Sequence, residues 1–160
     1  MLRRCVPPPT EVARVEFWDM DRFALALAQD DGATVRSLEG PVFKIVSGER
    51  STFCAYCYLT RASYAIAPRL AHVGRKEEAL NILLRMVEVD VAPSYDWLLR
   101  EPDIQLLRGD PRFGKVLAAS RDGAALLARL LREAQTRGEL PVYLEQPLDE
   151  LVRLLRQSDT

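Results

Sequence analysis

The sequence predicts an all-α protein made of antiparallel helical hairpins, with short connecting turns and at most a minor β ribbon. Apolar residues recur at three- and four-residue steps over most of the chain, which is the spacing of helices with one buried face. Glycines and prolines fall mainly between these stretches, where they end helices. The only strand-like runs are residues 42–46 and 141–144, which are too short to build a sheet and are interpreted as extended connectors.

Composition excludes several classes of protein. The 160 residues are 48% hydrophobic and 28% charged, with a net charge of −1, which is typical of one globular domain with a real core. A dedicated nucleic-acid-binding protein usually has a basic excess, so nucleic acid is an unlikely partner. No apolar run reaches the roughly 20 residues that a membrane helix needs, and prolines stand where a secretory signal would need an apolar helix. We therefore expect a cytoplasmic location and no membrane partner.

Residues 1–50 are predicted to form a proline-rich leader and a helical segment that packs on the core. An amphipathic helix is expected over residues 12–28, and Asp-Asp-Gly ends it. A short helical turn over residues 35–38 follows, and Gly40-Pro41 should break it.

Residues 51–121 are predicted to contain a helical hairpin, with helices over 51–73 and 76–89 joined at Gly74. Pro68 lies inside the first of these helices. A proline there removes a hydrogen bond and clashes with the preceding turn, at a cost of about 3 kcal/mol. The helix is therefore expected either to kink at Pro68, or to break and restart with Pro68 in its first turn.

The rest of the chain is predicted to consist of shorter helices. Turns should start at Ser94 and Pro102, and a short helix should follow the Asp110-Pro111 cap. Gly123 should separate that helix from the C-terminal helical pair in residues 122–160. Inward-facing positions are expected to include Trp18, Trp97, Ile104, Leu106, Leu107 and Phe113.

Residues 63–89 resemble a tetratricopeptide repeat, a pair of antiparallel helices with small residues where they cross. Ile66 and Ala67 stand at the packing positions of the first helix, Gly74 in the turn, and Ala79 and Leu83 at crossing positions of the second. A lone repeat cannot bury enough surface, so the flanking helices are expected to complete the core.

The segment over residues 95–113 resembles the closing element of some bacterial tetratricopeptide arrays. The matching pairs are Trp97-Leu98, Pro102-Asp103, Leu106-Leu107 and Asp110-Pro111, the last followed by Arg112-Phe113. The resemblance implies a protein–protein interaction or scaffold module of a bacterial regulatory system, with a protein or peptide partner. It implies neither an enzyme nor a cofactor.

One stripe of the helix over residues 51–73 carries the candidate partner-binding residues Arg61, Tyr64 and His72. In tetratricopeptide proteins, by resemblance, the corresponding stripe faces the concave surface. Arg61 can pair with a carboxylate, and Tyr64 can offer stacking and a hydrogen bond. The alternative is that this stripe packs against the N-terminal helix, with only Arg61 and His72 reaching water.

Two other functions remain open. Cys54 and Cys57 form a CxxC pair that fits a small thiol-redox or metal-binding protein. No second CxxC exists, and on a straight helix His72 lies over roughly 20 Å from Cys57, so buried apolar cysteines are favoured. The other alternative is a self-associating structural unit.

Charge segregation is the basis for that self-association. Residues 11–31 contain six acidic and two basic side chains, and residues 112–137 contain six basic and two acidic ones. The simpler interpretation is two solvated helix faces. The other is an acidic-to-basic contact, within one chain or between copies of a homo-oligomer.

Overall fold

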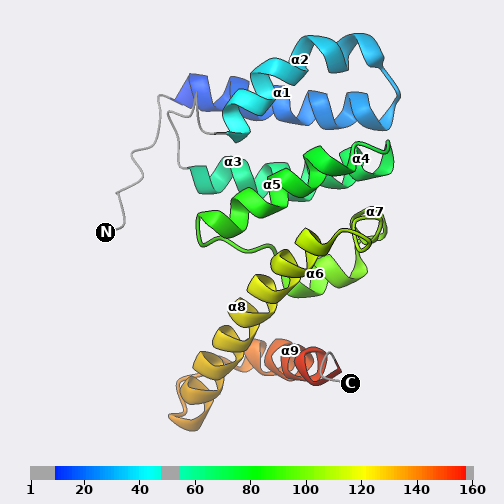
Figure 1. Ribbon diagram of the computed structural model, residues 1–160. Helices are drawn as coiled ribbons and strands as arrows, with labels where there is room; N and C mark the ends of the chain where they lie inside the picture. Colours follow the sequence, from blue (N-terminus) through cyan, green and yellow to red (C-terminus); the bar gives the residue numbers. More distant parts are fainter. Residues whose placement is uncertain (1–9, 48–54, 158–160) are drawn as a thin grey trace.

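The computed structural model describes residues 10–47 and 55–157, and every regular element within these ranges is helical (Figure 1). This confirms the predicted all-α fold class. In chain order the elements are α1 (Thr10–Ala28), α2 (Gly32–Val46), α3 (Ala55–Arg61), the π-helical turn η1 (Ala62–Ile66), α4 (Ala67–His72), α5 (Lys76–Glu88), α6 (Tyr95–Arg100), α7 (Pro102–Gln105), α8 (Pro111–Thr136), the 3-10 turn η2 (Val142–Leu144) and α9 (Glu145–Gln157).

The helices stack as successive hairpins around one core. α1 packs against α2, α4 against α5, and α8 against α9. The α1–α2 pair lies at one end of the molecule, the α3–α5 hairpin comes next, and the α8–α9 pair lies at the other end (Figure 1). Buried side chains from α1 through the start of α8 form one apolar cluster, which includes Phe23, Val42, Leu70, Leu83 and Val116. The N-terminal helices therefore help to complete the core, as predicted, whereas the described helices after Gly123, which were also expected to do so, add no residue to this cluster.

The prediction of an extended connector over residues 42–46 is wrong, because these residues form the end of α2. The helix continues through Gly40 and Pro41 and begins at an Asp31 cap, whose carboxylate accepts two backbone N–H bonds of 3.2 Å. Leu38, Val42 and Ile45 follow one another at helical spacing and are buried in the core. Burial of this face stabilises the helix against the local preference for a break.

The break predicted at Gly123 is also wrong, because α8 runs without interruption from Pro111 to Thr136. A glycine inside a helix costs only about 1 kcal/mol relative to alanine. Packing on both sides of Gly123 exceeds that cost, since Val116 is buried toward α5 and α6 and Ala128 toward α9. The second strand-like run is no connector either, because Val142–Leu144 forms a 3-10 turn.

The segment over residues 95–113 packs on the α4–α5 hairpin, with α7 against α4 and the start of α8 against α5. Ile104, Leu107 and Phe113 are buried, as predicted, and Leu98 is buried as well. Leu106, which was expected to face inward, is exposed because it lies on the outer side of the turn that follows α7.

An ion-pair network joins this segment to α5. Arg112 contacts both Glu77 of α5 and Asp110, the cap of α8. Its hydrogen bonds lower the pKa of the Asp110 carboxyl to about 2, and they lower the pKa of Glu77 as well. The network fixes the start of α8 beside the start of α5.

The acidic and basic segments do not meet within one chain. α1 packs against α2, η1 and α4, whereas α8 packs against α5, α6 and α9. The two segments therefore lie toward opposite ends of the molecule (Figure 1). An acidic-to-basic contact between two copies of the chain stays a prediction.

Candidate functional site

The candidate site is an exposed stripe that runs along α3, η1 and α4. Arg61, Tyr64, Arg69 and His72 are the large side chains that reach the surface along this stripe. Their neighbours Ile66 and Leu70 point into the core. Three of the four are the residues that the sequence predicted, and Arg69 is the one that it missed.

The π-helical turn explains why Arg69 reaches the surface in place of Pro68. The helix does not stop at Pro68, because η1 precedes it directly and the Ala67 N–H donates to Ala62 O, five residues back. Pro68 falls in the first turn of α4 and is buried. The wider turn shifts the register of the following residues by about one position. Pro68 itself was the available signal, since prolines inside helices are commonly accompanied by kinks or bulges.

Arg61 ties the stripe to α1. Its guanidinium Nε donates to Asp21 Oδ1 at 2.9 Å, and Nη2 contacts the other carboxylate oxygen. Both side chains are about half exposed. Trp18 and Leu25 lie three and four residues from Asp21, so they share its side of α1. They are 65% and 56% exposed, which corrects the prediction that Trp18 anchors the core.

Tyr64 ties the stripe to α6. Its ring meets Trp97 edge-on, with ring centroids 4.5 Å apart and an interplanar angle of 60°. The Ser94 backbone N–H donates to the Tyr64 hydroxyl oxygen at 2.7 Å, at the start of α6. Tyr64 nevertheless remains 38% exposed. The ring therefore has a fixed position and an accessible side.

His72 and Arg69 share a carboxylate on α7. His72 Nδ1 lies 2.9 Å from Asp103 Oδ1, and Arg69 Nη1 lies 3.6 Å from Asp103 Oδ2. The Asp103 side chain is mostly buried, whereas the Arg69 and His72 side chains are about half exposed or more. The two bases therefore share one acid and keep accessible edges at the surface.

The exposed side chains of this stripe, the side chains that contact them, and Trp18 and Leu25 on the Asp21 side of α1 are called here the α1/α4 face. The structure places Arg61, Tyr64 and His72 on one stripe, but each is held by a different neighbour: α1, α6 and α7 respectively. The face comprises Trp18, Asp21, Leu25, Arg61, Tyr64, Arg69, His72, Trp97 and Asp103. Tryptophan, tyrosine and arginine are the residue types most enriched at the energetic centres of protein interfaces.

Comparison with known proteins gives no family for the chain. No family model matches it, and neither a curated protein nor a solved structure matches it. The resemblance to tetratricopeptide repeats and to their closing element therefore stays an expectation based on residues 63–113.

The structure does not test the thiol hypothesis. Cys54 lies outside the described residues, and Cys57 belongs to α3 but its side chain is not described. Among the residues that are described, no group of three His, Cys, Asp or Glu side chains could hold a metal ion. A search of the same residues finds no helix that combines the length and apolar character needed to cross a membrane.

Proposed function

We propose that the protein is a protein-interaction module that binds a peptide segment of a partner protein on the α1/α4 face. The observation that carries this proposal is the exposure of Trp18 on the side of α1 that Arg61 contacts through Asp21. A large exposed aromatic side chain contributes apolar contact area on binding. The ring of Tyr64, which Trp97 and Ser94 hold in place, loses little entropy when it binds. The resemblance of residues 63–113 to bacterial tetratricopeptide proteins supports a scaffold role in a bacterial regulatory system.

The charges on the face favour a partner with a carboxylate. Arg61 and Arg69 are paired with Asp21 and Asp103 respectively. The guanidinium of Arg69 has five N–H donors, more than the Asp103 carboxylate can accept. An acidic side chain or a C-terminal carboxylate from the partner can therefore join this pair without displacing it.

An affinity pull-down from the lysate of the source cell tests the proposal. The site variant is Arg61→Ala/Tyr64→Ala, and the matched control is Arg129→Ala/Tyr143→Ala, which removes the same residue types from exposed positions on α8 and η2. We expect wild type and control to retain one specific partner and the site variant to lose it.

Trp18→Ala separates loss of binding from loss of folding. Arg61 and Tyr64 also hold α1 and α6 in place, whereas Trp18 is mostly exposed and its removal should change stability by less than about 0.5 kcal/mol. We expect Trp18→Ala to weaken partner capture at unchanged circular dichroism. Equal capture by wild type, Trp18→Ala and the double site variant contradicts the proposal, as does the absence of any retained partner.

A further inference from the structure

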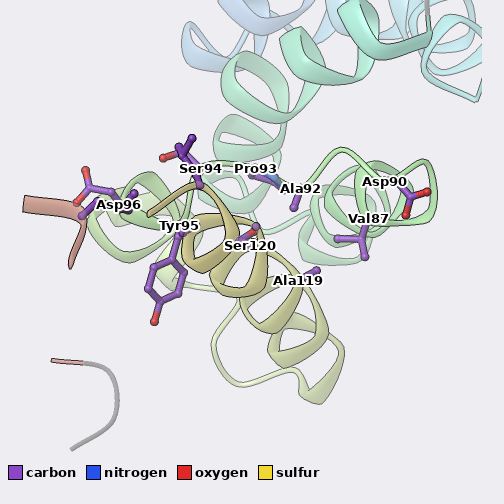
Figure 2. Close-up of a pocket in the computed structure, with 13 residues that line it drawn as sticks. Val87, Asp90, Ala92, Pro93, Ser94, Tyr95, Asp96, Ala119 and Ser120 are labelled. Carbon is purple, nitrogen blue, oxygen red and sulfur yellow. The ribbon is translucent and has the colours of Figure 1, made fainter. Parts of the chain in front are cut away.

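A second surface lies where α8 leaves the stacked helices (Figure 1). A pocket of about 500 Å³ opens there between the loop that joins α5 to α6 and the α8–α9 pair. Ala92 and Pro93 of the loop stand opposite Ala119 and Ser120 of α8 (Figure 2). Leu151 of α9 lines its outer edge.

Ser120 is the feature of this pocket that the fold itself does not explain. Its side chain is only 3% exposed, and its hydroxyl has no hydrogen-bond partner among the described residues. A buried hydroxyl without a partner costs about 1–3 kcal/mol, and such groups are rare in native proteins. Because Ser120 lines the pocket, a polar group of a bound molecule can satisfy it.

The floor of the pocket is made of small residues at helical spacing. Ala119, Ser120, Gly123 and Ala124 form it, and a Cβ atom added to Gly123 meets no atom within 4 Å. Packing within the chain therefore does not require glycine at this position. A floor without side chains does permit close approach by the backbone of another molecule.

An exposed apolar strip continues from the pocket along α8, and the pocket and this strip together are called here the groove. Leu127 lines the pocket, and both Leu127 and Leu130 are 50% exposed on the same side of the helix. From Ala119 to Leu130 the helix advances about 16 Å, at about 1.5 Å per residue. That length corresponds to three helical turns, which suits a helix lying alongside α8 better than a compact small molecule.

The rim of the pocket carries acidic side chains. Asp90 and Asp96 line the pocket from opposite sides (Figure 2), and the pocket-lining residues include no lysine or arginine. Asp96 has one neighbouring base, since Arg100 Nε lies 2.7 Å from its carboxylate. An apolar groove with an acidic rim favours a ligand that is apolar along its centre and basic at its edges.

We infer that this groove docks an amphipathic helix of a partner protein, with an apolar strip against Ser120 and Gly123 and basic side chains beside Asp90 and Asp96. A polar side chain or a free carbonyl in that strip accepts a hydrogen bond from the Ser120 hydroxyl. The site uses other residues than the α1/α4 face but adjoins it, because the backbone N–H of Ser94, which lines the pocket, donates to Tyr64 of that face. It gives the module a second contact for a partner. Ser120 and Gly123 are the positions that decide the fit.

The test uses a display library of 16-residue helical peptides, panned on the full chain and followed by fluorescence anisotropy of the enriched peptides. We expect these peptides to share an apolar strip at i, i+4 and i+7 and to carry net positive charge. Gly123→Leu, which fills the groove, should weaken their binding at least tenfold. Gly114→Leu is the matched control, because it makes the same change in open space on the same helix, outside the groove.

Two further variants test the rim charges and the shape of the groove. Asp90→Asn/Asp96→Asn should reduce affinity several-fold and flatten its dependence on salt. Ala124→Leu is a second groove-filling change in case Gly123→Leu alters the fold, which circular dichroism and urea unfolding will report.

The inference is overturned if no peptide is enriched, if the enriched peptides are acidic, or if the groove-filling variants bind them as wild type does. It is also overturned if Gly123→Leu abolishes a self-association, because the occupant is then a second copy of the chain. Enriched peptides whose binding is abolished only by Arg61→Ala/Tyr64→Ala overturn it as well, but they support the proposed function.

Discussion

Gly123→Ala is expected to stabilise the protein, although Gly123 was predicted from the sequence to end a helix. Gly123 lies in the interior of α8, and the added methyl group meets no other atom. Glycine in the middle of a helix is less favourable than alanine by roughly 0.5–1 kcal/mol. For a chain of this size, about 1 kcal/mol raises the melting temperature by about 2–4 °C. Gly123→Ala should therefore raise the unfolding free energy by up to 1 kcal/mol.

Gly74→Ala supplies a comparison of opposite sign. Gly74 also has open space around it, but its φ is +84°, a conformation that costs an L-residue roughly 1–2 kcal/mol. Urea and thermal unfolding, followed by circular dichroism, measure both variants against wild type. If Gly123→Ala lowers stability as Gly74→Ala does, α8 is not a continuous helix, and the groove argued from its register is refuted.

Two further predictions concern contacts between layers. Because the folded-state pKa values of Asp110 and Glu77 are lowered by Arg112, the stability that they contribute is complete above their unfolded values and is lost as pH falls from about 4 toward about 2. Acid titration of unfolding should show this loss in wild type and a smaller one in Arg112→Ala. Tyr64→Phe keeps the ring but removes the oxygen that accepts from the Ser94 N–H, so urea unfolding should show a loss of about 0.5–1.5 kcal/mol; no loss means that this bond is not formed in solution.

Cap and stop residues were enough to predict α1, which Asp30-Asp31-Gly32 ends, and amphipathic periodicity was enough to predict α5. It was not enough for α2 and α8, where Pro41 and Gly123 suggest breaks. Neither residue abolishes a helix on its own. The outcome depends on how much apolar surface the flanking turns bury against other layers, and that quantity is set by residues far away in the chain.

The candidate site likewise contains residues that the sequence could place and residues that it could not. Helical spacing brings Arg61, Tyr64 and His72 onto one stripe, so the sequence could place them together. Their partners Asp21 and Asp103 come from helices 40 and 31 residues away, and no local pattern indicates such pairs. The contribution of α1 to the face could therefore be found only from the structure.

Pro68 determines which side chains the face displays. A regular helix through this region would set the Pro68 ring against the carbonyl of Tyr64, at a cost of about 3 kcal/mol. The π-helical turn just before Pro68 avoids that clash and shifts the register, so that Arg69 reaches the surface and pairs with Asp103. The proline that was expected to kink or break the helix thus favours the backbone irregularity that brings Arg69 onto the α1/α4 face. Uniform helical spacing could not have predicted Arg69 there, because the wider turn changes the register only after Ala62.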